Sequence, residues 1–210
     1  MIRIIVADDH PVVRRGIGQI VAAAGDMRVA DEAATGRELL DRARTVDHDL
    51  VLLDLSMPEM IGLDLLKQLK RERPKIPIVI LTVSSENQFA IRALKAGAAG
   101  YLTKDTAATE LVGALRKVVT GGRYLSPSMA ERLAGHLTAD ADRPLHEKLS
   151  DREYQVLRMI AAGKSTRRIS TELSLSVKTI GTYRARIFEK MQMKSPAELA
   201  AYAVRNRLSD

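Results

Sequence analysis

The stretch that most constrains the fold is an unbroken apolar run, Leu50-Val51-Leu52-Leu53, which ends on the carboxylate Asp54. A strand that is apolar at every position suits a parallel sheet covered by helices on both faces, because neither face then meets water. In open sheets of this kind, ligands and chemistry lie just beyond the carboxyl ends of the strands. The pattern therefore predicts that Asp54 stands at a functional edge of the sheet.

The alternation of strand-like and helical patterns extends over residues 1–122. Short apolar runs give way to segments with helical apolar periodicity, and Gly or Pro follows most of those segments. Five such units in succession predict a doubly wound α/β domain of the flavodoxin-like (βα)5 class. The expected strands cover residues 3–7, 28–32, 50–53, 78–81 and 99–102.

Polar side chains collect where these strands end. Asp8 and Asp9 follow the first strand, and Asp54 ends the third. Three carboxylates in one cleft repel one another, so they require a cation, and hard oxygen ligands favour Mg²⁺. A carboxylate beside that metal can attack a phosphoryl group and form an acyl phosphate. Thr82 and Lys104, after the fourth and fifth strands, can supply a hydroxyl donor and a positive charge. Each residue alone has an ordinary structural explanation, but the set predicts a phosphorylation site.

A family resemblance supports the same site. It rests on Asp8-Asp9, Asp54 followed by Met57-Pro58, Thr82, Tyr101 and Lys104, and it makes residues 1–122 similar to the receiver domain of two-component response regulators. The resemblance implies that a sensor histidine kinase phosphorylates Asp54. It also implies that Asp9, Asp54 and the backbone carbonyl of Ser56 hold Mg²⁺, with Asp8 assisting. Thr82 would then move toward the phosphoryl group while Tyr101 turns inward behind it, as a two-state switch.

Two residues beside the site depart from the receiver pattern. Ile61 stands before Gly62, where a small polar residue is usual, and Val83 follows Thr82, where a smaller residue is usual. We expect these departures to alter the lifetime of the phosphoryl group without abolishing the reaction. His10, beside the acidic pair, is expected to have a structural or supporting role.

A change of pattern separates the two parts of the chain. Met129, Leu133 and Leu137 predict one short amphipathic helix, and residues 138–144 then lack any apolar period and end on a Pro. We therefore expect residues 123–148 to be a connector helix and a linker, with the domain boundary between about 138 and 148.

Residues 149–210 predict a small all-α domain. Ser150 and Glu153 have the spacing of a capping box at the start of a helix, and Ser195 and Glu198 repeat that spacing with a Pro at the first helical position. Helical patterns between these two points bring the number of helices to four. Four helices in such a short segment make a bundle with one core.

Positive charge is concentrated in the middle of this bundle. Eight Lys and Arg residues stand against two Glu between Gly163 and Lys194. Such a concentration favours a polyanionic partner, although a plain bundle with a solvated basic face is the alternative. A helix over residues 176–191 presents short and cationic side chains opposite its apolar face, which suits the major groove of DNA. The residues expected at DNA are Lys164, Arg167, Arg168, Lys178, Thr179, Thr182, Tyr183, Arg184 and Arg186.

The order of residues in this second part carries another resemblance. It rests on Leu149-Ser150, Arg152-Glu153, Val156-Leu157, Ala162-Gly163-Lys164-Ser165, Ile169-Ser170, Leu173, Leu175-Ser176 and Thr179-Ile180, and it makes residues 149–210 similar to the LuxR-type helix-turn-helix. The whole chain thus resembles a NarL/FixJ-type response regulator. Three departures fall on the DNA-reading part. Gly181 and Tyr183 stand where Lys and His are usual, and Arg168 replaces a usual Glu.

The resemblance also implies a homodimer. The last helix would carry the DNA-bound dimer contact at Leu199, Ala203 and Val204, as a two-fold-symmetric DNA site requires. We expect dimerisation when Asp54 is phosphorylated. The remaining expected partners are the sensor histidine kinase, double-stranded promoter DNA and, as a candidate, RNA polymerase.

Composition narrows the class of protein further. The chain has no Cys, so it can form neither a disulfide nor a thiolate metal site. Its apolar runs fall far short of the roughly 18 residues that a membrane span needs. We therefore expect a cytoplasmic protein without a membrane partner.

The leading hypothesis is a phosphorylation-controlled transcription factor that catalyses only its own phosphotransfer and dephosphorylation. One alternative is a constitutive DNA-binding protein whose degenerate receiver serves only for dimerisation, but the complete set of site residues argues against it. Another is an enzyme on the same fold, such as a phosphatase or a flavin protein. Ser56 argues against the phosphatase, because it stands where a second catalytic acid would be needed.

Overall fold

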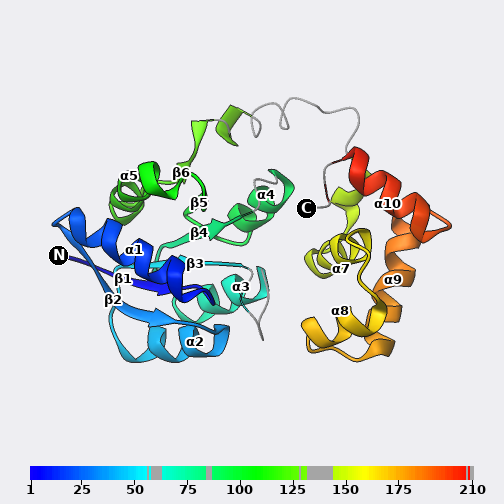
Figure 1. The fold of residues 1–210 in the computed structure, drawn as a ribbon, viewed down its shortest axis with the longest axis horizontal. Helices are drawn as coiled ribbons and strands as arrows, with labels where there is room; N and C mark the ends of the chain where they lie inside the picture. The colour runs from blue at the N-terminus through cyan, green and yellow to red at the C-terminus, as the bar shows by residue number, and fades with distance from the viewer. Residues whose placement is uncertain are drawn as a thin grey trace. The chain divides into compact units, whose positions relative to one another are not determined.

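The computed structural model describes residues 1–55, 57, 63–83, 87–127, 129–131, 144–206 and 208. The chain forms two compact units, Met1–Leu133 and Ala134–Asp210 (Figure 1). Among the described residues, no helix combines the length and the apolar character that a membrane crossing requires. The expected connector lies partly outside the described residues, as do Leu133 and Leu137, so its helix stays a prediction.

The first unit is built on a parallel sheet with the strand order β2-β1-β3-β4-β5-β6 (Figure 1). Its strands are β1 (Ile2–Ala7), β2 (Met27–Ala33), β3 (Leu50–Leu53), β4 (Ile78–Thr82), β5 (Gly100–Thr103) and β6 (Tyr124–Leu125). Neighbouring strands pair in parallel throughout. The predicted doubly wound α/β fold is confirmed, and the five expected strands agree with the observed ones to within one residue at each end.

Helices cover both faces of this sheet. They are α1 (Pro11–Ala23), α2 (Gly36–Thr45), α3 (Leu63–Glu72), α4 (Asn87–Lys95) and α5 (Ala107–Val119). Strand β3 explains the unbroken apolar run, because Leu50 and Leu52 pack with α1 and α5 in one core, while Val51 and Leu53 pack with α2, α3 and α4 in the other. Burial of each such side chain contributes roughly 1.5–3 kcal/mol, so both faces of the strand are committed to packing.

Strand β6 was not predicted, and it lies at the start of residues 123–148, which the sequence analysis gave as connector helix and linker. Tyr124 instead pairs with Gly100, and Leu125 pairs with Tyr101 on β5. Glycine allows this close approach, since a Cβ at residue 100 would meet the backbone oxygen of Tyr124 at 3.3 Å. Two residues carry too little periodicity to be recognised as a strand.

The second unit is a bundle of α7 (Asp151–Ala161), α8 (Thr166–Glu172), α9 (Val177–Met191) and α10 (Pro196–Arg205), as predicted. At the start of α7, the Ser150 hydroxyl accepts the backbone N–H of Glu153, and the Glu153 carboxylate accepts that of Ser150. A 3₁₀ turn, η1 (Leu145–Lys148), precedes it where the sequence predicted a linker. This turn is ordered by tertiary contacts, because His146 is buried and its Nδ1 lies 2.8 Å from the Tyr202 hydroxyl.

Candidate functional site

An acidic cluster, Asp8, Asp9 and Asp54, lies where strands β1 and β3 end, close to the residues that follow β5. Lys104, which follows β5, places its Nζ 2.7 Å from Oδ2 of Asp54 and 2.7 Å from Oδ2 of Asp8. Both carboxylates are only 1% exposed. The ends of parallel strands meet at one edge of the sheet, so three side chains far apart in the sequence form one ion-paired group. This clustering was predicted from the strand pattern.

The carboxylates around Lys104 favour its protonated, positively charged form. Burial by itself would lower the pKa of the Lys104 ammonium, but the hydrogen bond to Asp54 and the attraction of Asp8 outweigh burial, so its pKa is raised. Lys104 therefore carries its positive charge at neutral pH. Asp9 brings a third carboxyl group to the same cluster, and its Oδ1 lies 2.8 Å from Nδ1 of His10.

The donor set fits a divalent cation. Ligand atoms of Asp8, Asp9, His10 and Asp54 all lie within 4.8 Å of one another. Asp8 Oδ2 lies 2.7 Å from the Lys104 ammonium, and Asp9 Oδ1 lies 2.8 Å from Nδ1 of the His10 ring. Oxygen ligands of this kind suit Mg²⁺. Ser56, expected to contribute its carbonyl, lies outside the described residues, as does Ile61.

The two predicted switch residues lie on neighbouring strands, Thr82 at the end of β4 and Tyr101 on β5. Thr82 ends β4, is 4% exposed, and its carbonyl accepts the backbone N–H of Lys104 at 2.7 Å. Tyr101 on β5 pairs with Ile80 of β4 and is buried in the core that β5 shares with α4. Taken alone, an aromatic at this position would more commonly pack at the surface, but here the ring is already inside.

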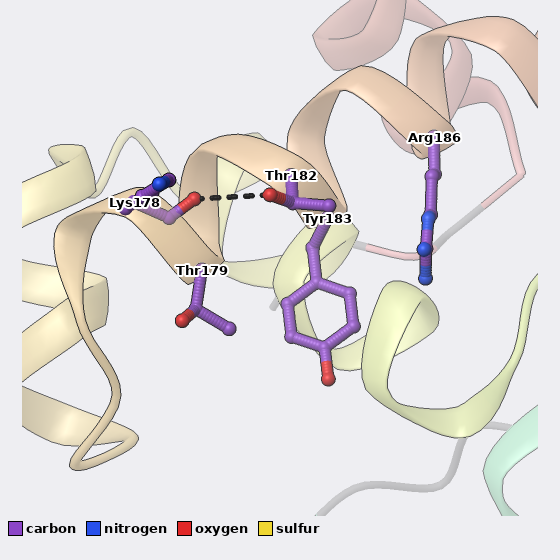
Figure 2. Close-up of a pocket in the computed structure, with 5 residues that line it drawn as sticks. All are labelled: Lys178, Thr179, Thr182, Tyr183 and Arg186. Carbon is purple, nitrogen blue, oxygen red and sulfur yellow. Dashed lines mark hydrogen bonds between the residues drawn. The ribbon is translucent and has the colours of Figure 1, made fainter.

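The second candidate site is the exposed face of α9. The Ser176 hydroxyl caps the helix by accepting the backbone N–H of Thr179 at 3.0 Å. Five of the nine predicted DNA-contact residues line one groove of about 270 Å³: Lys178, Thr179, Thr182, Tyr183 and Arg186. Figure 2 shows Thr179, Tyr183 and Arg186 directed to one side of the helix. Ser174, in the turn between α8 and α9, adopts the left-handed conformation with φ 52°, which makes the turn short.

The remaining predicted contacts lie apart from this groove. The Arg184 guanidinium lies over the Phe188 ring, 5.5 Å from its centroid, and Arg184 does not line the groove. Lys164 and Arg168 both bond to the carboxylate of Glu172, whose pKa is lowered first by the hydrogen bond from Lys164. Arg167 on α8 is exposed. The sequence analysis did not identify the pairing with Glu172.

The predicted dimer contact on α10 needs correction. Leu199 and Ala203 are 0% exposed because they fill the core of the bundle, so their side chains have no surface to offer a second copy. Val204 is 67% exposed and is the one residue of the three whose side chain is available. Leu199 and Ala203, four residues apart, lie on one side of α10, whereas Val204 is five residues from Leu199 and faces away from them toward solvent.

Comparison with known proteins identifies both units. Residues 4–116 match the family described as response regulator receiver domain, and residues 147–203 match the bacterial regulatory proteins of the luxR family. The chain is 42% identical over 212 residues to the response regulator GacA of Pseudomonas aeruginosa, covering 100% of this chain and 99% of that protein.

Two solved structures of RcsB are similar along nearly the whole chain. One is RcsB from Salmonella enterica serovar Typhimurium bound to the promoter rprA in the presence of phosphomimetic BeF3-, at 26% identity and a TM-score of 0.73, covering 96% of this chain and 97% of that one. The other contains two RcsB dimers bound to two parallel DNAs, at 28% identity and a TM-score of 0.61, covering 97% of this chain and 98% of that one.

Proposed function

This chain belongs to the NarL/FixJ-type response regulators, in which a receiver precedes a LuxR-type helix-turn-helix, and from that premise we propose that phosphorylation of Asp54 controls its dimerisation and its binding to promoter DNA. The observation that carries the proposal is the bridging of Asp8 and Asp54 by the Lys104 ammonium at the ends of three strands. The proposal extends to a sensor histidine kinase as the phosphodonor, to RNA polymerase as a candidate partner and to a cytoplasmic location.

The phosphotransfer requires little of the protein besides position and charge. An Asp54 carboxylate oxygen forms a bond to phosphorus while the P–N bond to the kinase histidine breaks, and the departing imidazole keeps the electron pair of that bond. Lys104 turns from the carboxylates to the new phosphoryl oxygens, and the Thr82 hydroxyl donates a hydrogen bond to them. Mg²⁺, held by Asp8, Asp9 and Asp54 with the carbonyl of Ser56, would neutralise charge on those oxygens.

The output follows from what Lys104 and Thr82 do when the phosphoryl group arrives. Movement of Thr82 toward the phosphoryl group leaves space behind it on β4. The inward-facing Tyr101 ring on β5 then packs behind Thr82 and stabilises the switched state. The second unit then binds a two-fold DNA site as a dimer, with α9 in the major groove. Lys178, Thr182 and Arg186 stand one helical turn apart on the exposed face, which is the spacing that a helix needs to follow a groove.

Intact-mass spectrometry tests the proposal directly. We expect incubation with acetyl phosphate and Mg²⁺ to add one phosphoryl group to the wild type and none to Asp54→Asn. Addition that survives in Asp54→Asn would refute Asp54 as the acceptor. A wild type that takes up no phosphoryl group yet binds DNA would favour the constitutive DNA-binding protein instead.

Replacing Arg186 or Lys178 by Ala should weaken DNA binding about tenfold, since one base or phosphate contact is worth roughly 1–3 kcal/mol. The measurement is fluorescence anisotropy with a duplex selected from a random-sequence library. Lys148→Ala, at an exposed position in η1, is the matched control and should bind like the wild type.

The salt dependence of the same titration separates DNA from other partners. Phosphate contacts release counterions, so the logarithm of the affinity should fall steeply and linearly with the logarithm of salt concentration. Each alanine variant that removes a phosphate contact should reduce that slope by about one. Unchanged affinity in both variants, or a flat salt response in the wild type, would refute α9 as the reading helix.

A further inference from the structure

Arg14, in the first turns of α1, connects the acidic cluster to strand β2. Its Nη1 donates a hydrogen bond to the backbone carbonyl of Asp8 at 2.7 Å, and its Nε donates to Oε2 of Glu32 at 2.8 Å. The Arg14 side chain is only 14% exposed. A guanidinium presents these donors in a rigid plane, so Arg14 holds three segments in one geometry: α1, the loop after β1, and the end of β2.

This contact fixes a peptide plane inside the cation site. The backbone N–H of Asp8 already bonds to the carbonyl of Ala33 at 3.1 Å. The Asp8 carbonyl oxygen, which Arg14 binds, belongs to the planar peptide between Asp8 and Asp9. Fixing that oxygen therefore also fixes the direction in which the chain reaches Asp9. The backbone N–H of His10 then bonds to Oδ1 of Asp8 at 2.8 Å, which completes a loop held at successive residues.

The ion pair between Arg14 and Glu32 does not by itself explain why Arg14 is held in this position. Glu32 is half exposed, and ion pairs with one partner in solvent contribute little to folding stability. The bond to the Asp8 carbonyl is different, because it acts on the residue that supplies one cation ligand and precedes another. We propose that Arg14 is a positioning residue for the divalent-cation site, which holds the Asp8–Asp9 backbone so that both carboxylates converge. This inference rests on the proposed function.

The charge and the geometry of Arg14 have opposite effects on cation affinity. The positive charge of Arg14 repels Mg²⁺. If Arg14 acted only through this charge, replacing it by Ala should tighten Mg²⁺ binding. Removing a residue that orients the ligands should weaken binding instead, typically by ten- to a hundredfold for groups that support metal ligands. The sign of the change therefore distinguishes the two roles.

The experiment measures the Mg²⁺ dissociation constant of the full-length protein by isothermal titration calorimetry. We expect Arg14→Ala to bind Mg²⁺ about tenfold more weakly than the wild type. Arg15→Ala is the matched control, since it removes the same charge from the next, exposed position of α1, and it should bind as tightly as the wild type or slightly more tightly. Equal or tighter binding by Arg14→Ala would overturn the proposal.

Two further variants keep the test decisive. Arg14→Lys retains the charge but not the planar fork, so weaker Mg²⁺ binding in a folded Arg14→Lys supports the proposal even if Arg14→Ala does not fold. Unchanged binding by Arg14→Lys, with Arg14→Ala unfolded, would assign Arg14 to folding alone and overturn the proposal. Glu32→Gln keeps an oxygen acceptor for Arg14 and should bind Mg²⁺ within about twofold of the wild type. If Glu32→Gln lost as much Mg²⁺ affinity as Arg14→Ala, the ion pair with Glu32 would be responsible and the bond to the Asp8 carbonyl would not, which would overturn the proposal.

Phosphorylation kinetics give a second readout. With acetyl phosphate as donor, Arg14→Ala should need about tenfold more Mg²⁺ for half-maximal rate and should approach the wild-type rate when Mg²⁺ is saturating. A lower rate at saturating Mg²⁺ with unchanged Mg²⁺ dependence would contradict positioning of the cation ligands. If the wild type itself neither binds Mg²⁺ nor takes up the phosphoryl group, the proposed function fails, whereas failure of Arg14 alone leaves that function intact.

Discussion

Replacing Lys104 by Ala should lower the free energy of unfolding of the first unit by about 3 kcal/mol in Mg²⁺-free buffer. The variant leaves Asp8 and Asp54, each 1% exposed, without the cation that lies 2.7 Å from both. Buried carboxylates that lose the cation between them are costly, and a loss of this size is a large fraction of the stability of an ordinary domain. Chemical denaturation followed by circular dichroism measures the change, since the chain has no Trp.

Two conditions should reduce the difference in unfolding free energy between Lys104→Ala and the wild type. Mg²⁺ supplies positive charge to the same carboxylates, so it should stabilise the variant more than it stabilises the wild type. High pH should also narrow the gap. The pKa of Lys104 is raised in the folded state, so its stabilisation is complete below the unfolded pKa of about 10.4 and is lost as the pH rises through the folded value.

Lys117→Ala, at an exposed position on α5, is the control for the loss of one positive charge and should change stability by less than about 0.5 kcal/mol. Equal stability of Lys104→Ala and the wild type without Mg²⁺ would show that the ion pairs are not what balances the buried carboxylates. The proposed function then predicts a second defect, because phosphorylated Lys104→Ala should fail to gain DNA affinity.

Replacing Glu153 by Ala should destabilise the second unit by about 2–3 kcal/mol. The Glu153 carboxylate is nearly fully buried, accepts the backbone N–H of Ser150 at 2.8 Å, and receives Lys190 from α9 at 2.6 Å. Loss of a helix cap costs about 1 kcal/mol, and loss of a hydrogen bond from a charged group costs about 1.5–3 kcal/mol. The contact also joins α7 to α9, the helix proposed to read DNA, so DNA affinity should fall together with thermal stability.

The pH dependence of this loss has a definite sign. Burial alone would raise the pKa of Glu153, but the hydrogen bonds from Lys190 and Ser150 outweigh burial and lower it. A carboxylate with a lowered folded pKa stabilises above its unfolded pKa of about 4.3, and this contribution is lost as the pH falls through the folded value. The difference in unfolding free energy between wild type and Glu153→Ala should therefore narrow as the pH falls below the unfolded pKa of about 4.3 and close once the pH is below the lowered folded pKa.

Glu189→Ala, at an exposed position on α9, is the control for a lost carboxylate in the same unit and should unfold like the wild type. A Glu153→Ala protein that is as stable as Glu189→Ala would contradict a structural role for the bond between α7 and α9.

Periodic patterns allowed much of this architecture to be predicted. A strand buried on both faces and a helix with one apolar side have distinct repeats, so the first five strands and the helix over residues 176–191 could be located to within one residue at each end. The convergence of Asp8, Asp54 and Lys104 was also predictable, because parallel strands bring their carboxyl ends to one edge. The same reasoning identified Lys178, Thr182 and Arg186 as neighbours on the exposed face of α9.

Other features could not be predicted, because they depend on which side chains meet across the fold. Periodicity placed Leu199, Ala203 and Val204 on one helix, but only packing in the bundle decided that the first two are covered. The charge pattern gave no sign that the Arg184 guanidinium stacks on Phe188 outside the groove on α9, and its predicted contact with DNA stays a prediction.

The sequence by itself determined the order of the strands and helices, the two-part organisation and the carboxylates at the strand ends. These properties are carried by local repeats of apolar residues, which are independent of any distant partner. The tertiary structure alone decided the pairing of β6 with the strand that carries Tyr101, the partners of Lys164, and the bond from Arg14 to the Asp8 carbonyl. Such contacts join residues whose separation along the chain has no fixed relation to their distance in space. They therefore cannot be predicted from local sequence patterns.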